Sequence, residues 1–194
     1  MRRSGELKLV PQVLQQERKL GIGEPEPRGD GAIRDSLVNT LLAQPELRNC
    51  TIRAQRNSQM EVVHEGPKGF DSAGDIDVTV RDGVVMLEGK VISHSHRRLA
   101  GVLAWWTRGR RDVMNGLDVD PPEADGDEEL TDALRLVLES DPSIDAGQVR
   151  LSCCAGVVTL EGQVRSRGEF RRVELDAWYV QSVSGVVNRL QVRS

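Results

Sequence analysis

Two segments of the chain place an apolar residue at every fourth position. The residues are Ile33, Leu37 and Leu41 in one segment and Leu130, Leu134 and Leu138 in the other. This spacing puts the three side chains of each segment on one face of an α-helix, and a proline downstream ends each pattern. The pattern therefore predicts one amphipathic helix in each half of the chain.

After each predicted helix the pattern changes to alternation of apolar and polar residues. Residues 76–91 read IDVTVRDGVVMLEGKV. A period of two is typical of a β-strand, and the central Asp-Gly is typical of a tight turn between antiparallel strands. We expect a β-hairpin in which Leu87 and Gly89 face the helices and Glu88 faces the opposite side of the sheet.

The same pattern occurs twice, at a constant offset of 73 residues. DGVVMLEGKV at residues 82–91 corresponds to AGVVTLEGQV at residues 155–164. The offset continues through a second helical segment, where AWW at residues 104–106 corresponds to AWY at residues 177–179, and into a last short strand. The chain therefore contains two copies of one supersecondary unit.

The first copy is larger than the second. The first helices repeat at an offset of 97 residues, so 24 residues are inserted in the first copy, at about 49–74. TIRAQ and MEVVH in this insertion are expected to form a further hairpin around Asn57-Ser58. Each unit has the order α-β-β-α-β, and a right-handed crossover makes its last strand parallel to the strand before it. The predicted fold class is α+β, with a small mixed three-stranded sheet and two helices on one face of it in each unit.

These patterns divide the chain into four parts. The first unit covers residues 33–119 and the second covers residues 128–194. Residues 120–127 are acidic, contain proline and have no basic residue, which predicts a stiff linker. Residues 1–32 are expected to form a flexible N-terminal tail, because their second half is rich in glycine and proline.

The composition fits a soluble globular protein. The chain has 194 residues, of which 38% are hydrophobic, and a formal net charge of -4 at pH 7, so nucleic acid is not expected as a partner. No apolar run is long enough for a signal peptide or a transmembrane helix, and three cysteines do not make a disulfide framework. We expect a cytoplasmic protein that can associate peripherally with a membrane.

The repeated pattern resembles the BON domain, a bacterial osmotic-stress and nodulation family that occurs singly or in tandem. The second unit carries the pattern as G-V-V-x-L-x-G-x-V at residues 156–164 and V-x-G-V-x-N-x-L-x-V at residues 183–192. The first unit matches it at residues 83–91 and has Asp112 where the family has glycine. The resemblance implies a non-enzymatic tandem BON-domain protein that attaches to phospholipid surfaces or to proteins.

Aromatic and arginine residues gather on and beside the second helix of each unit. On a helical projection the aromatic residues fall mostly on the side opposite the stripe that faces the sheet. The candidate lipid- or partner-binding residues are Arg97, Arg98, Trp105, Trp106, Arg108, Arg110, Arg111, Arg171, Trp178 and Tyr179. Two interpretations of the aromatic residues stay open: they form a contact surface, or they pack beneath the first helix or between the repeats.

Seven further residues are expected to serve the fold itself. They are Gly83, Gly89, Gly156, Gly162, Gly185, Asn115 and Asn188. Gly89 and Gly162 are expected on the inner face of a strand, where the missing Cβ lets a helix approach the sheet closely.

The sequence offers no catalytic, cofactor or metal site. We find no nucleophile with a neighbouring base. His94 and His96 have no third ligand at metal-binding spacing and are expected to be an exposed pair in a loop. Cys153 and Cys154 are neighbours on a strand, so one is expected in the core and the other on the surface. We therefore expect a binding protein without a cofactor or bound metal.

Two functions follow from these features. The first is peripheral association with anionic phospholipid, or with an envelope-associated assembly, through the second helices. The alternative is a cytoplasmic protein-interaction or self-association module, including a homo-oligomer, that uses the uncovered sheet face and does not bind lipid. The position of the arginines relative to exposed aromatic residues distinguishes the two, because lipid binding needs both on one surface.

Overall fold

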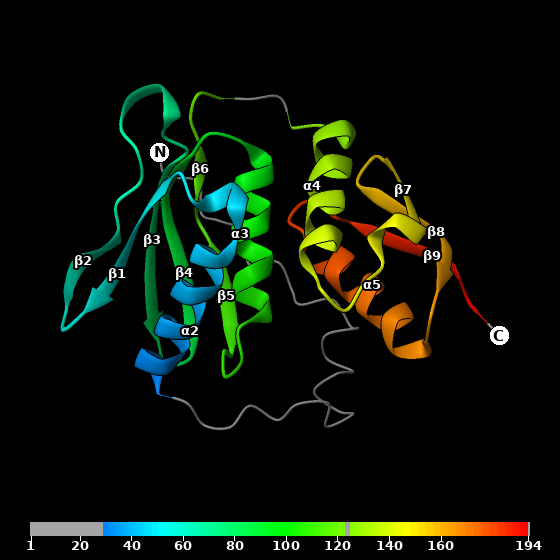
Figure 1. The fold of residues 1–194 in the computed structure, drawn as a ribbon, viewed down its shortest axis with the longest axis horizontal. Helices are drawn as coiled ribbons and strands as arrows, with labels where there is room; N and C mark the ends of the chain where they lie inside the picture. The colour runs from blue at the N-terminus through cyan, green and yellow to red at the C-terminus, as the bar shows by residue number, and fades with distance from the viewer. Residues whose placement is uncertain (1–28, 123–124, 194) are drawn as a thin grey trace.

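The computed structural model describes residues 29–122 and 125–193 of the chain. Within these ranges the protein has two α+β units, and in each of them helices cover one face of a sheet (Figure 1). Of the expected tail, residues 1–28 lie outside the described residues, and the first helix already begins at Asp30.

The first unit contains a wide mixed sheet and two long helices. Its elements are α2 (Asp30–Ala43), η1 (Pro45–Leu47), β1 (Cys50–Arg56), β2 (Gln59–His64), η2 (Gly69–Asp71), β3 (Gly74–Arg81), β4 (Val84–Val91), α3 (His94–Trp106), β5 (Asp112–Asn115) and β6 (Asp118–Val119). The strand order is β2-β1-β3-β4-β5, and β6 also pairs with β4. Strand β5 runs parallel to β4, as the crossover rule predicts.

The second unit has the same order of elements without the insertion. Its elements are α4 (Asp127–Ser140), η3 (Ala146–Gln148), β7 (Val149–Cys154), β8 (Val157–Val164), α5 (Arg167–Tyr179) and β9 (Gly185–Val192). The strand order is β7-β8-β9, with β7 antiparallel and β9 parallel to β8. The predicted α+β fold class, with two α-β-β-α-β units, is confirmed.

The insertion widens the first sheet. Strands β1 and β2 form an antiparallel hairpin, and its turn residues Asn57 and Ser58 have positive φ angles of 48° and 65°. Strand β1 also pairs in parallel with β3, from Cys50 opposite Gly74 to Ala54 opposite Val78. The edge of β3 that faces away from β4 is therefore covered by a strand of the insertion.

An aspartate at the start of the first helix holds the hairpin turn in each unit. The Asp30 carboxylate accepts hydrogen bonds from the backbone N–H groups of Asp82 and Gly83 at 2.9 and 2.8 Å. Asp127 accepts the equivalent bonds from the turn at residues 155–156, at 2.7 and 3.0 Å. These bonds fix the helix to the sheet at one end and lower the pKa of Asp127, chiefly through the backbone N–H groups of the turn.

The glycines in β4 and β8 allow close backbone contacts within the sheet rather than close packing of a helix on it. Gly89 and Gly162 have positive φ angles of 120° and 128°, a conformation that favours glycine. A Cβ at Gly89 would lie 2.3 Å from the backbone oxygen of Asp75, and one at Gly162 would lie 2.0 Å from that of Gln148. We expected these glycines to make room for a helix. That expectation is wrong, because the atoms closest to the missing Cβ belong to the adjacent backbone segment of the sheet, in β3 or just before β7. A Cβ at Gly185 would have its nearest neighbour at 3.5 Å, an ordinary contact.

Two asparagines connect the last strand of each unit to its second helix. Asn115 Nδ2 donates to the backbone oxygen of Arg97 at 2.7 Å, and Asn188 Nδ2 donates to Glu174 Oε2 at 3.1 Å. The Oδ1 atom of each asparagine accepts the backbone N–H two residues farther on. The two asparagines thus satisfy polar groups at the junction of strand and helix.

Candidate functional site

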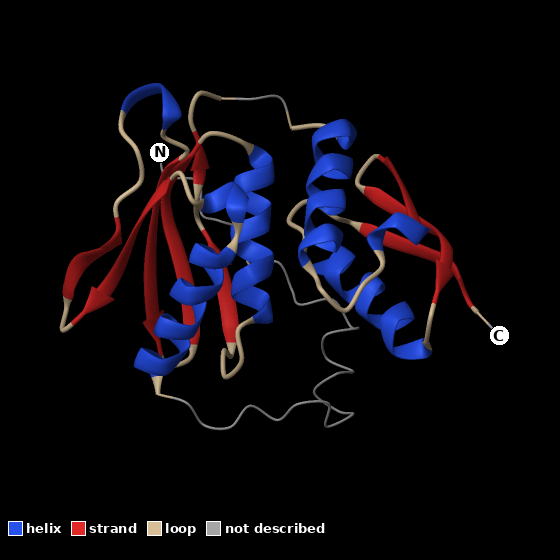
Figure 2. Ribbon diagram, viewed as in Figure 1, coloured by secondary structure: helices blue, strands red, loops and turns tan. Residues whose placement is uncertain are grey.

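The two units meet through their helices. In Figure 2 the helices occupy the middle of the molecule and the two sheets lie on either side of them. Helix α3 of the first unit contacts α4 and α5 of the second. Buried residues of both units belong to one hydrophobic cluster, so the surface between them is part of the core.

Stacked aromatic rings from the two repeats contact each other across this interface. The rings of Trp105 and Tyr179 are parallel within 1°, with centroids 5.3 Å apart. The guanidinium carbon of Arg110 lies 5.2 Å from the Trp105 centroid and 6.0 Å from the Tyr179 centroid. A cation over an aromatic face is favourable, and more so where water is excluded. Tyr179 is only 8% exposed, and Trp105 and Arg110 are partly buried.

A buried carboxylate forms the second polar contact between the repeats. Trp106 Nε1 donates to Asp176 Oδ1 at 2.8 Å, and Asp176 is completely buried. Arg172 lies over the Trp106 ring at 5.2 Å and pairs with both Asp176, at 3.4 Å, and Asp141, at 2.6 Å. Burial raises the pKa of Asp176 to about 8, against the opposing effects of Arg172 and the Trp106 hydrogen bond.

Asp141 responds differently to the same arginine. Burial would raise its pKa, but hydrogen bonds from Ser143 and Arg172 outweigh that effect and lower the pKa. Arg172 therefore lies between one carboxylate that stays ionised and one that binds a proton near neutral pH.

Residues in the first turns of α3 contact the second unit and the linker that precedes it. Arg98 is 3% exposed, donates from Nε to the backbone oxygen of Gln181 at 3.0 Å, and forms an ion pair with Asp125. Arg97 Nε donates to Gln181 Oε1 at 3.1 Å, and His94 Nδ1 lies 3.6 Å from Asp125 Oδ2. These contacts connect α3 to the linker before α4 and to the loop after α5.

The two histidines do not form an exposed loop pair, so that expectation is wrong. His94 is buried in the first turn of α3. His96 Nδ1 lies 2.6 Å from Ser93 Oγ, and its Nε2 lies 3.1 Å from the backbone oxygen of Glu46. Within residues 29–122 and 125–193, no group of three or more histidine, cysteine or acidic side chains is arranged to hold a metal.

The paired cysteines lie as the strand pattern predicts. Cys153 is partly buried and donates to Asp127 Oδ1 at 3.2 Å, whereas Cys154 is exposed. Burial, followed by the hydrogen bond to Asp127 and its negative charge, raises the pKa of Cys153 to about 11. A thiol with such a pKa is a poor nucleophile at neutral pH.

The candidate binding residues divide into two groups. Arg108, Arg111 and Arg171 are exposed. The other seven are buried or partly buried, and six of them make the contacts between repeats described above: Arg97, Arg98, Trp105, Trp106, Arg110 and Tyr179. The structure therefore places most of the predicted aromatic and arginine surface between the repeats.

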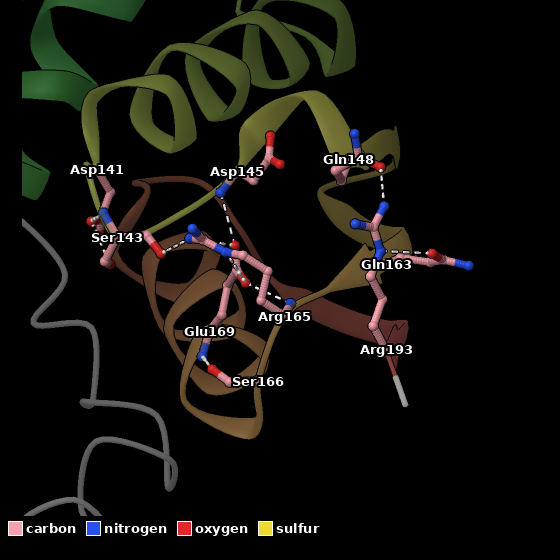
Figure 3. A network of polar contacts seen from close by, with 9 residues as sticks. All are labelled: Asp141, Ser143, Asp145, Gln148, Gln163, Arg165, Ser166, Glu169 and Arg193. Carbon is pink, nitrogen blue, oxygen red and sulfur yellow. Dashed lines mark hydrogen bonds and ion pairs between the residues drawn. The ribbon is translucent and has the colours of Figure 1, made fainter.

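A polar cluster that the sequence pattern did not indicate fixes the loop between α4 and β7 (Figure 3). The buried Glu169 side chain accepts hydrogen bonds from the backbone N–H groups of Asp145 and Arg165, at 2.8 and 2.7 Å. The Arg165 guanidinium binds Glu169 as well, and donates to the backbone oxygen of Ser143 at 2.8 Å. Burial would raise the pKa of Glu169, but these bonds and the charge of Arg165 lower it. Glu169 occupies the position of His96 in the first unit, and both side chains bind the loop after the first helix.

Exposed apolar side chains mark a different part of the surface. Of the eight large hydrophobic side chains that are exposed within the described ranges, six lie on strands: Met60, Val62, Met114, Val157, Val187 and Val192. The other two are Phe70 in η2 and Ile92 before α3. The alternating pattern of the strands, carried through to their outward positions, is the signal that could have identified several of them.

Comparisons with solved structures give weak similarities. The chain is similar to the C-terminal domain of CdsD, a structural protein of the type III secretion system of Chlamydia trachomatis, with a TM-score of 0.32 and 14% identity over 86% of this chain and 68% of that one. A second CdsD structure gives a TM-score of 0.30 and 16% identity over 86% and 66% of the two chains. No sequence among the curated proteins matches the chain. None of the helices in the described part of the chain has the length and apolar character of a membrane span.

The family comparison agrees with the repeat. The family model described as BON domain matches residues 51–121 and again residues 126–194. The first match covers the strands and the second helix of the first unit, and the second match covers the whole second unit, including α4. The chain therefore belongs to the BON-domain family and carries two BON domains in tandem.

Proposed function

We propose that this chain is a non-enzymatic binding protein that associates with other proteins, or with copies of itself, through its sheets. In this proposal the aromatic and arginine residues of α3 and α5 hold the two repeats together. The observation that supports it most is the position of the exposed hydrophobic side chains, six of which lie on strands while the aromatic residues of α3 and α5 are buried or partly buried.

The uncovered face of the first sheet offers a suitable surface. Strand pairing places Met86 beside Thr79 and Met114, in one row on the face turned away from the helices. Met60, paired with Gln55 on the same face, is 42% exposed, and Met114 is 59% exposed. Methionine is flexible and polarizable, and it is common on surfaces that adapt to protein partners.

Lipid binding through the second helices would need the repeats to separate. Insertion of Trp106 into a membrane would break its hydrogen bond to the buried Asp176. Exposure of Trp105 would break its stacking on Tyr179 and its contact with Arg110. These losses oppose the use of α3 and α5 as a membrane surface.

One observation favours phospholipid as a second kind of ligand, at another place. BON domains are known to bind phospholipid, and Phe70 in the insertion is fully exposed, close to the exposed Lys68. An exposed aromatic ring beside a basic residue suits the membrane interface, although Lys68 also pairs with Glu65 at 3.1 Å.

Vesicle sedimentation tests the proposal. The full chain is mixed at low salt with vesicles of anionic or of zwitterionic phospholipid. We expect it to stay in the supernatant, or to pellet with anionic vesicles only through Phe70, so that Phe70→Ala abolishes pelleting. Pelleting that persists in Phe70→Ala and is lost in the double variant Arg108→Glu, Arg111→Glu would contradict the proposal, because it would assign lipid binding to the arginine cluster.

A further inference from the structure

The two units differ at one edge of their sheets. In the first unit β1 covers the outer edge of β3 beneath α2, whereas among the described strands none covers the equivalent edge of β7 (Figure 1). A groove of about 240 Å³ lies there, between α4 and β7. It is lined by Arg135, Leu138, Glu139, Ala146, Gly147, Val149 and Leu151.

The floor of this α4–β7 groove consists of residues whose counterparts in the first unit are buried. The counterparts at the offset of 73 residues are Ile76 for Val149, Val78 for Leu151 and Ala73 for Ala146. Ile76 and Val78 are 0% exposed and Ala73 is 4% exposed, whereas the three residues of the second unit are only partly buried. The second unit thus has an apolar floor without the strand that covers it in the first.

Exposed charged side chains of α4 line the helix side of the groove. Positions Val38 and Leu42 of α2 are buried or partly buried, and their counterparts in α4 are the exposed charged residues Arg135 and Glu139. If a strand covered the groove permanently, apolar residues would be favoured at these helix positions, as they are in the first unit. Charged side chains at the rim instead suit an occupant that binds and leaves.

The charge beside the groove is reversed between the units. Arg53 of β1 pairs with Asp77 and Asp75, which lie on the outer face of β3. The counterpart of Asp77 is Arg150, which is exposed, and that of Asp75 is Gln148. A strand added here would therefore favour an acidic residue at the position that Arg53 occupies in β1.

We propose that the α4–β7 groove binds an extended peptide segment of a partner protein, added as a strand parallel to β7, with aliphatic side chains toward the groove and an acidic side chain beside Arg150. The inference rests on the proposed function and names a site for it. The register of β1 on β3 places the occupant's groove-facing residues opposite Val149 and Leu151. The open edge of β7 supplies backbone hydrogen bonds, and the apolar floor selects the alternate side chains.

The groove is held in shape before any peptide arrives. Its floor continues into the loop that Glu169 and Arg165 fix to α5 (Figure 3). Next to it, Arg193 Nη2 donates to Gln148 Oε1 at 3.0 Å. A preformed site avoids the free-energy cost of ordering a loop on binding.

Two short peptides test this proposal on the full chain. Both have the sequence of residues 49–56 with Cys50→Val, and one of them also has Arg53→Glu. Fluorescence anisotropy of the labelled peptides measures their affinity. We expect the acidic peptide to bind about fivefold more tightly than the basic one, as expected for exchanging a like charge for an opposite charge at an exposed pair.

A charge exchange in the protein supplies the control. Arg150→Glu should reverse the preference, so that the basic peptide binds more tightly, whereas Arg167→Glu, at an exposed arginine on α5, should leave it unchanged. Absence of binding of both peptides at millimolar concentration, or a preference that Arg150→Glu does not alter, would overturn the groove proposal. Failure of the peptides while vesicle sedimentation gives the expected result would remove this site alone. Lipid binding through the arginine cluster would contradict the proposed function whatever the peptides do.

Discussion

The ring of Trp105 in the first repeat lies parallel to the ring of Tyr179 in the second, with their centroids 5.3 Å apart. The repeat offset does not relate these two residues, because it matches Trp105 to Trp178 and Trp106 to Tyr179. The interface between the repeats is also asymmetric, because α3 packs extensively against α4, the first helix of the second repeat, whereas no comparable packing of α5 against α2 occurs among the described helices. This asymmetry gives each aromatic residue a separate environment and a separate prediction.

The first prediction compares two tryptophans. Trp106→Phe removes the hydrogen bond to the buried Asp176, whereas Trp178→Phe removes an indole N–H that is buried without a partner among the described residues. Both changes remove the same part of a ring, so their difference reports on the hydrogen bond together with the contact of the Trp106 ring with Arg172. We expect Trp106→Phe to lower the free energy of unfolding by about 1–2 kcal/mol more than Trp178→Phe, measured by urea denaturation. Equal losses would show that the bond does not stabilise the interface.

The second prediction concerns pH. The pKa of Asp176 is raised from 3.8 to about 8 in the folded protein, so between these values the folded state holds a proton that the unfolded chain has released. The free energy of unfolding therefore falls as pH rises through this range, by at most about 1.4 kcal/mol per pH unit from this group. Asp176→Asn cannot titrate and keeps an oxygen for Trp106, so its stability should depend less on pH. Thermal unfolding from pH 5 to 8 measures the difference, and identical slopes for both proteins would contradict the assignment.

The third prediction separates two glycines. A Cβ at Gly162 would lie 2.0 Å from the Gln148 oxygen and would be strained at φ 128°, whereas one at Gly185 has its nearest neighbour at 3.5 Å. We expect Gly162→Ala to cost more than about 3 kcal/mol, since it adds a backbone clash to conformational strain. Gly185→Ala should change the stability by less than about 1 kcal/mol. Circular dichroism during denaturation measures both, and similar costs would mean that the strand relaxes around residue 162.

Local patterns in the sequence were enough to predict the architecture. Short motifs that recur at an offset of 73 residues identified the repeat, and Asn57-Ser58 marked the turn of the inserted hairpin. Strands, helices and turns of this kind are specified by residues close together in the sequence. The helical projection also placed Trp178 and Tyr179 away from the sheet. It did not reveal that this side meets the other repeat, because docking of two units depends on contacts between residues far apart in the sequence.

The buried charges could not be predicted in the same way. Asp176 lies between Leu175 and Ala177, and Arg98 lies in a basic run that resembles a solvated surface. Both are buried because partners from elsewhere in the chain, Trp106 and Asp125, satisfy them. Strand pairing likewise explained Gly89 and Gly162, whose neighbouring carbonyl oxygens become apparent only when the strands are in register.

Hydrogen–deuterium exchange of the full chain, with and without anionic phospholipid vesicles, tests most directly the claim that α3 and α5 hold the repeats together. We predict that the amides of residues 94–106 and 167–179 exchange equally slowly in both samples, because the helices remain packed between the sheets. A change of exchange in both helices when vesicles are added, together with sedimentation of the protein, would contradict that claim.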